Sequence, residues 1–387
     1  MKSLYTNLQY SMPPHRMKLT DEEKDKLVRL DAEYGRLQKL FRFSWNYNHP
    51  TNVDEQYDQF IKAYNNGIEF YPVFKTDKDI AALRECKDGF MRLASEFQKF
   101  NCFLSKYYIQ RCLEFSHRAA FAINPKEHAL WFVEKMNQTP TQEETAIAKK
   151  LLKEHPYKKP DKAARNINAE RALKFCKKKM EKYDGFKVQI KQDMMPRMGV
   201  STKELALNIS ANAMFSDIDL AGLNAHEIRG HVARRYYAAK TGLWLMVFGL
   251  DEANDFDEGI AVYNSLHRVK IRKPNILFNI SMKTYVASMI PNKTFYEIFD
   301  ICHKEFPTID TKVLFKTISR FKRELGDCSL LGGNGDDQSY LCGYLKVKDM
   351  TQKQRDELIR YNIGPKQLAE LDDIKEFFAV NKFKPLI

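Results

Sequence analysis

The sequence predicts an α+β fold that is mainly α-helical and carries one small sheet beside a central helix. Apolar residues recur at helical spacing through most of the 387-residue chain, whereas the alternation typical of a strand stands out at residues 205–210. Glycine and proline are sparse and no internal repeat is evident, which argues against a low-complexity chain or a repeat array. With 44% hydrophobic residues, the chain can bury a sizeable core.

Two closely packed parts are expected. Residues 1–139 should form a helical N-terminal subdomain, because helical spacing rich in Phe and Tyr runs from Leu19 to about Asn137. Residues 140–387 should form a second subdomain, which begins with a basic helical stretch that ends near Gln192. No linker of distinct composition separates the two parts, so we expect one compact unit overall.

The central helix is expected to begin near Ser216 and to end near Gly242. Ser216 and Asp219 have the spacing of a capping box, and Gly242 follows Lys240 as a glycine beyond a helix C-terminus often does. Just upstream, apolar residues alternate with small or polar ones over residues 205–210 and predict a short, half-buried strand. We interpret this segment as an ordinary edge strand.

The hexapeptide HEIRGH, His226 to His231, falls in the middle of this helix. Zinc peptidases use two histidines around a glutamate, usually four residues apart, because that spacing places both imidazoles on one helix face. Five residues apart, the second imidazole would point roughly 140° away, unless a π-bulge with its i→i+5 bond absorbs the extra residue. We therefore predict a π-bulge, eased by Gly230, and a metal site with Glu227 as general acid and base. The alternative is two ordinary surface or core histidines.

A catalytic zinc site needs a third protein ligand and an open position. The acidic segment 251–261 supplies candidates: Glu258, which begins an apolar stretch typical of a second helix, and its competitor Glu252. Spacing alone does not decide between them. Metal-bound histidines usually donate their other ring nitrogen to an acceptor, for which Asp257 or Asp255 could serve. The strand at 205–210 could then hold the backbone of a substrate, as the alternative to an ordinary edge strand.

The motif pair resembles a known family. HEIRGH followed by Asp257–Tyr263 is similar to the signature HExxxH and QEGLA of the microtubule-associated tyrosine carboxypeptidases and the related bacterial QEGLA-motif proteins. The resemblance extends more loosely to Lys322-Arg323 and to residues 332–341, and covers most of the chain. Asp257 stands here in place of the Gln and Ile260 in place of the Leu, and Arg229-Gly230 differ from the Gly-Thr of tubulin-processing members.

The resemblance implies a zincin-like metallopeptidase in which His226, His231 and Glu258 bind Zn²⁺ and Glu227 is the catalytic acid and base. It also implies release of a C-terminal tyrosine, or another aromatic residue, from a protein such as tubulin or from a peptide. Dipeptidyl peptidases with HExxGH are a second resemblance, but they lack an equivalent of the segment that contains Glu258. A metallo-endopeptidase or dipeptidyl peptidase is therefore the alternative function, and it would tolerate a blocked C-terminus.

A carboxypeptidase must recognise a free C-terminal carboxylate, for which a bidentate arginine is the strongest group. Arg323 is the candidate and Arg320 the second choice, each with a solvated surface side chain as the alternative. Tyr263 and Tyr340 could stabilise the oxyanion of the tetrahedral intermediate, or could be core tyrosines.

The formal charge of +13 suggests attraction to a polyanion, and the resemblance makes acidic protein tails, such as those of tubulin, the expected partner. Lysine-rich runs near residues 158–162 and 177–179 could instead contact nucleic acid or acidic lipid, although no base-reading motif is present. A non-catalytic basic protein that binds microtubules or nucleic acid is thus a further alternative. The glycine-rich residues 332–337 lack the GK[ST] of a phosphate-binding loop and are expected to precede a helix capped by Asp336 or Asp337.

Seven cysteines, none in a CxxC pair, and a start without a signal-like apolar stretch indicate a reducing, intracellular setting. We expect a cytoplasmic protein, or one delivered into a host cytoplasm if it is an effector. The longest apolar run, Gly242–Leu250, is too short to cross a bilayer and is expected to be a buried strand or connector.

Overall fold

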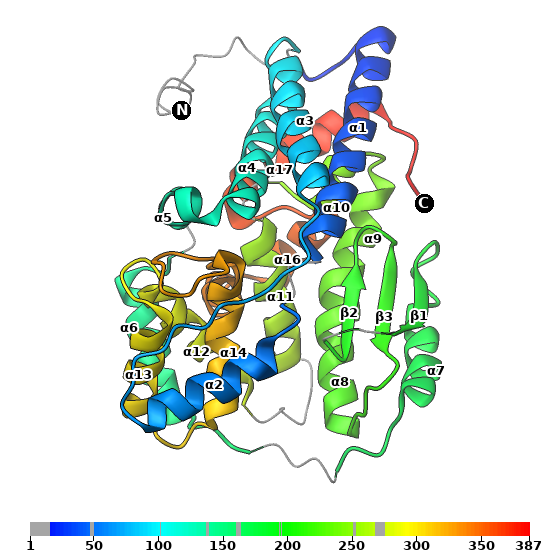
Figure 1. Cartoon of the computed structure of the whole chain (residues 1–387). Coiled ribbons are helices and arrows are strands. Elements are labelled where there is room, and N and C mark those ends of the chain that lie inside the picture. The colour runs from blue at the N-terminus through cyan, green and yellow to red at the C-terminus, as the bar shows by residue number, and fades with distance from the viewer. Residues whose placement is uncertain are drawn as a thin grey trace.

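A computed structural model describes residues 16–46, 50–100, 102–136, 139–159, 164–192, 194, 196–250, 253–267 and 275–387. Helices dominate these residues, and three short strands form one sheet beside a long central helix (Figure 1). The predicted class, α+β and mainly α, is confirmed. The zincin-like detail stays a prediction.

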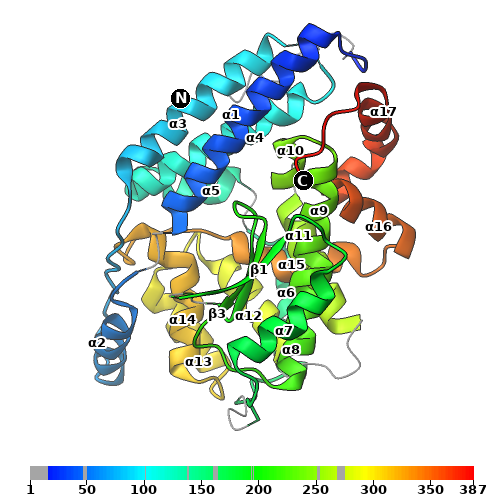
Figure 2. The same cartoon turned by 90° about the vertical axis from the view of Figure 1, so that its right-hand side faces the viewer.

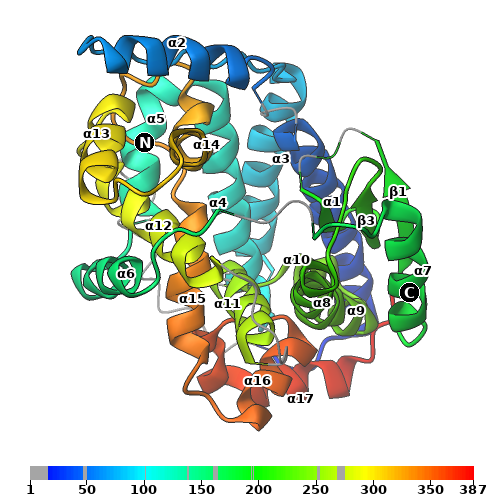
Figure 3. The ribbon, with the colours of Figure 1, turned by 90° about the horizontal axis from the view of Figure 1, so that it is seen from below.

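The N-terminal helices α1, α3 and α4 lie alongside one another and form the upper part of the molecule in Figure 2. Helix α2 is separate from them and packs against α14 (Figure 3). The bounds are α1 Asp21–Asn46, α2 Val53–Asn65, α3 Ile80–Gln98, α4 Ser105–Ile123, α5 Pro125–Lys135, α6 Gln142–Glu154, α7 Ala169–Met180 and α14 Thr311–Lys322.

The sheet has the order β1-β3-β2, with strands β1 Lys187–Lys191, β2 Met198–Ser201 and β3 Ala206–Ser210. Strand β3 pairs in parallel with β1 and antiparallel with β2, so that Ile209 lies opposite Ile190 on one side and Met198 on the other. The expected edge strand is therefore the central one, and all five of its residues are buried. The prediction was wrong because strand pairing is set by distant segments, and β3 has no free edge to offer a substrate.

The central helix runs through three consecutive elements: α8 Asp217–His226, the π-helical turn η1 Glu227–Val232 and α9 Ala233–Lys240. Ser216 and Asp219 form the predicted capping box, and Gly242 beyond the end has the left-handed φ of +87°. Both predicted ends are confirmed. The apolar run that follows forms a short buried helix, α10 Trp244–Phe248, rather than a strand.

Helix α11 Ala253–His267 packs across α8 and η1, and α15 Ser339–Val347 packs on the other side of α11 (Figure 3). The second contact is very close, since a Cβ on Gly259 would lie 2.3 Å from the carbonyl carbon of Gly343. The remaining elements are α12 Ile276–Met289, α13 Phe295–Glu305, η2 Arg323–Leu325, η3 Asp336–Gln338, α16 Gln352–Tyr361, η4 Pro365–Glu370 and α17 Leu371–Asn381.

One hydrophobic core crosses the predicted boundary between residues 139 and 140. It joins side chains of α1, α3 and α4 to side chains of α9, α10, α11 and the C-terminal helices. Asp31 of α1 fixes this junction, because its carboxylate accepts hydrogen bonds from the Tyr108 hydroxyl and from the backbone N–H groups of Trp244 and Leu245. The two predicted subdomains thus share a core, while their division stays a prediction.

All seven cysteines are buried and none forms a disulfide. Within the described ranges, no helix combines the length and the apolar character needed to span a bilayer.

Candidate metal centre

The two histidines of HEIRGH are brought together by a six-residue π-helical turn, Glu227–Val232. The ring centroids of His226 and His231 lie 5.0 Å apart, with their planes at 77°. The predicted π-bulge is confirmed, and it does what the spacing required: it returns residues five apart to the same face of the helix.

Gly230 lies inside this turn, but its backbone is not in the left-handed region. A Cβ at this position would lie 2.9 Å from the Cβ of Ala261 on α11, closer than two such atoms approach. The predicted reason for the glycine was therefore incomplete: it also lets α11 approach the π-helical turn closely enough to bring its carboxylate to the histidines.

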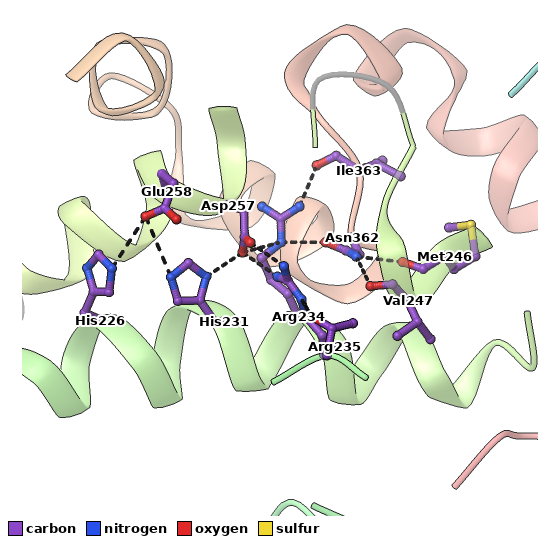
Figure 4. Close-up of polar contacts among 11 residues, drawn as sticks. His226, His231, Arg234, Arg235, Met246, Val247, Asp257, Glu258, Asn362 and Ile363 are labelled. Carbon is purple, nitrogen blue, oxygen red and sulfur yellow. Dashed lines mark hydrogen bonds and ion pairs between the residues drawn. The ribbon is translucent and has the colours of Figure 1, made fainter. Parts of the chain in front are cut away.

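Glu258 of α11 supplies that carboxylate (Figure 4). Its Oε2 lies 3.5 Å from Nε2 of His226 and 3.8 Å from Nε2 of His231, and one ligand atom from each of the three residues falls within 4.8 Å of the others. Among the described residues Oε2 has no hydrogen-bond partner, although it is buried. A buried carboxylate oxygen of this kind, facing two imidazoles, fits a divalent metal ion. The competitor Glu252 lies outside the described residues.

Asp257, next to Glu258, faces the other ring nitrogen of His231, with Nδ1 and Oδ1 2.9 Å apart. Arg235 pairs with both oxygens of this carboxylate, and Arg234 lies 3.6 Å from it. Burial alone would raise the pKa of Asp257, but the positive charges of Arg235, His231 and Arg234 hold it well below its usual range. Asp255, the other acceptor considered, instead pairs with Lys346 of α15.

Arg234 is fully buried and extends this network away from the metal centre (Figure 4). Its Nε donates to Oδ1 of Asn362, whose amide donates to the carbonyls of Met246 and Val247 in α10. The guanidinium also lies 4.4 Å from the centre of the Phe256 ring. Sequence reasoning missed this residue, because Arg234-Arg235 resembles the solvated face of a helix and no local pattern distinguishes it.

Glu227 is buried beside the three donor residues, and burial raises its pKa while the two histidines oppose that rise. A carboxyl group whose pKa is raised above its usual value is suited to accept a proton and to return it.

Tyr340 of α15 reaches the same centre. Its ring is nearly parallel to that of His226, with centroids 6.3 Å apart and an angle of 14°. The negative charge of Glu258, together with burial, raises the pKa of Tyr340 well above its usual range, which keeps the phenol protonated and able to donate a hydrogen bond.

Asp336 and Asp337 do not cap α15, contrary to the prediction. The short helix η3 begins at Asp336 and leads directly into α15, so neither side chain is needed as a cap. Asp336 pairs with Arg118 of α4, and Asp337 pairs with Arg320 of α14 and with Lys283 of α12. These are long-range contacts that the local sequence does not reveal.

The other two predicted substrate-binding residues, Tyr263 and Arg323, have other surroundings than the three candidate metal donors. The Tyr263 ring stacks on His267 at 4.4 Å and lies 4.2 Å from the guanidinium carbon of Arg355. Arg323 begins η2 and lines, with Arg320, a pocket of about 600 Å³ between α14 and the start of α2. Arg320, rather than Arg323, pairs with Asp337, and both Arg320 and Asp337 act electrostatically on Tyr340.

Two imidazoles and a carboxylate that face one point, with a second glutamate beside them, form the donor set and base typical of a metallopeptidase. Comparison with known proteins is more specific. The model of a family described as microtubule-associated tyrosine carboxypeptidase matches residues 125–381. The chain belongs to this family, which confirms the resemblance of its motifs and points to a carboxypeptidase, a class of protease. A search of curated proteins finds no match to the chain.

Proposed function

We propose that this protein is a zinc-dependent carboxypeptidase that releases a C-terminal tyrosine, or another aromatic residue, from a protein such as tubulin or from a peptide. One observation carries the proposal: the buried Oε2 of Glu258 faces Nε2 of both His226 and His231 and has no hydrogen-bond partner among the described residues. Family membership supports the carboxypeptidase reaction.

Four residues of the chain would bind and orient the metal. His226, His231 and Glu258 would hold Zn²⁺, which when bound polarises a carbonyl and lowers the pKa of water. Asp257 accepts the Nδ1–H of His231, so the lone pair of Nε2 points towards the shared centre. These contacts orient the donors before substrate binds.

Glu227 is the proposed general base and acid. Its carboxylate accepts a proton from the attacking water and later delivers a proton to the nitrogen of the leaving residue. Tyr340, kept protonated by the charge of Glu258, donates a hydrogen bond to the oxyanion that develops on the scissile carbonyl.

Acidic protein tails are the proposed partners, since the net charge of +13 attracts polyanions. Salt should weaken this attraction, because it shortens the range of electrostatic forces. We also propose a cytoplasmic location, or the cytoplasm of a host cell, where seven unpaired cysteines would stay reduced.

Mass spectrometry of an acidic peptide that ends in tyrosine, incubated with zinc-loaded protein, tests the reaction. The free acid should lose one tyrosine, its C-terminal amide should stay intact, and Glu227→Gln should leave both peptides intact. Cleavage of the amide at an internal bond would show an endopeptidase and replace this proposal.

A further inference from the structure

Beside the metal donors lies a second charged cluster, formed by Lys283 of α12, Arg320 of α14 and Asp337 of η3. Arg320 donates from Nε and Nη2 to the two oxygens of Asp337, the latter at 2.9 Å. Lys283 lies 3.6 Å from the same carboxylate. Figure 3 shows α12, α14 and α15 together on the side of α11 away from the sheet.

The charges of this Lys283–Arg320–Asp337 cluster do not balance. Arg320 already occupies both oxygens of Asp337, and the Lys283 contact is longer than a hydrogen bond. Within the cluster two cations face one anion, which leaves one positive charge, and only 17% of the Lys283 side chain is exposed. The carboxylate of Glu258 also acts on Lys283 and Arg320, but in the proposed function it binds zinc. Because charges in protein interiors are normally compensated, the cluster is suited to receive an anion.

Tyr340 connects the cluster to the metal centre. Nζ of Lys283 lies 3.5 Å from the centre of the Tyr340 ring, and the same ring runs nearly parallel to that of His226. The spare positive charge is thus one aromatic side chain away from a metal donor. In a substrate the terminal carboxylate lies one residue, or about 3.5 Å of chain, beyond the scissile carbonyl.

Arg320 is the accessible member of the cluster. Arg320 lines the pocket between α14 and the start of α2, together with Lys75, Lys316 and Arg323. Its side chain is 42% exposed, so a bound chain can approach the cluster from this pocket.

We propose that Lys283, held beside Arg320 and Asp337, binds the terminal carboxylate of the substrate. The inference rests on the proposed carboxypeptidase function and deepens it. The carboxylate neutralises the spare charge and forms a charge-assisted hydrogen bond with the ammonium group. This assigns to a lysine the role that the sequence suggested for Arg323, and it explains how a metallopeptidase centre would select chain ends.

Peptide binding to a variant that cannot cleave the peptide tests this inference independently of the reaction. In zinc-loaded Glu227→Gln, dissociation constants are measured by calorimetry for an acidic peptide ending in tyrosine, as free acid and as C-terminal amide. The free acid should bind roughly 10- to 100-fold more tightly, the range of one charge-assisted hydrogen bond. Adding Lys283→Met should abolish this preference, and adding Lys283→Arg should retain most of it.

Lys304→Met is the matched control, because Lys304 also pairs with an aspartate but lies exposed on α13. It should leave the preference unchanged. A preference that survives in Lys283→Met would place the carboxylate elsewhere, for example on the metal itself, and overturn the inference. So would equal binding of acid and amide in the Glu227→Gln parent.

The double variant Lys283→Met/Asp337→Asn covers the case in which Lys283→Met folds poorly. It removes one cation and one anion, so Arg320 again carries a spare positive charge. A regained preference for the free acid supports the charge argument, whereas a folded double variant without preference contradicts it. Cleavage of the free acid by the protein with Glu227 intact tests the proposed function separately, because that reaction can fail while the binding preference stands.

Discussion

Nδ1 of His231 lies 2.9 Å from Oδ1 of Asp257, and both groups are buried. This contact sets which imidazole nitrogen faces the proposed metal centre, and Arg235 holds the carboxylate in turn. The imidazole of His231 is therefore oriented by a hydrogen-bond network on the side away from Glu258. This network reaches α10 through Arg234 and Asn362.

Replacing Asp257 should weaken the binding of the proposed zinc ion. We expect Asp257→Ala to weaken zinc affinity about 10- to 100-fold, the usual effect of losing the acceptor behind a metal-bound histidine. Competition with a chromophoric chelator measures this affinity. Asp255→Ala, which loses an ion pair on the same helix, is the control and should bind zinc like the wild type. Unchanged affinity in a folded Asp257→Ala protein would contradict the assigned role.

Adding one carbon atom at residue 230 should destabilise the fold. In Gly230→Ala the new Cβ would lie 2.9 Å from the Cβ of Ala261, so α11 must shift. We expect a loss of about 1–3 kcal/mol in the free energy of unfolding, typical of overpacking. Urea titration measures the loss. Gly199→Ala is the control, since its Cβ would meet only an atom 3.8 Å away, and equal stabilities of the two variants would refute the close approach.

Stability should depend on pH through Asp31. Burial raises the pKa of this carboxyl to about 6, while its hydrogen bonds from Tyr108, Trp244 and Leu245 oppose the rise. The folded state therefore binds the proton more tightly than the unfolded state, whose pKa is about 3.9. The stability from this group is therefore largest below about pH 4 and is lost as the pH rises towards 6, by up to about 3 kcal/mol.

Asp31→Asn removes this titration. In metal-free protein, the free energy of unfolding of the wild type minus that of Asp31→Asn should be larger at pH 4.5 than at pH 7. A difference that does not change with pH would show that Asp31 titrates normally in the folded state.

Tyr340 and Tyr263 offer a matched pair of hydroxyl deletions. Tyr340→Phe should lower kcat on a tyrosine-ending peptide by roughly 100-fold with zinc content unchanged, because one donor to the oxyanion is lost. Tyr263→Phe should have little effect, since its ring packs with His267 and Arg355. Steady-state kinetics measure kcat for both variants. A larger loss of kcat in Tyr263→Phe than in Tyr340→Phe would exclude Tyr340 from the reaction.

Features set by local spacing could be predicted from the sequence. The capping box at Ser216 and the π-bulge between His226 and His231 follow from residues a few positions apart. Features set by contacts between distant segments could not. Strand β3 is central because β1 and β2 both pair with it, and Lys283 lies beside Arg320 because α12 and α14 both contact η3 at Asp337.

The same limit explains the choice between neighbouring side chains. Asp255 and Asp257 are equivalent in the sequence, and only the packing of α11 on the π-helical turn directs Asp257 to His231 and Asp255 to Lys346. Gly230 was assigned to the backbone distortion, whereas its contact with Ala261 belongs to the packing of two helices.

On the proposed function, zinc held by His226, His231 and Glu258 is required for removal of a C-terminal residue. The most direct test strips the protein of metal, restores zinc, and follows the mass of a tyrosine-ending peptide with wild type and with Glu258→Gln. We predict loss of one tyrosine only with zinc-restored wild type. Equal loss with the metal-free protein, or with Glu258→Gln, would show that zinc at these three residues is not needed for the cleavage.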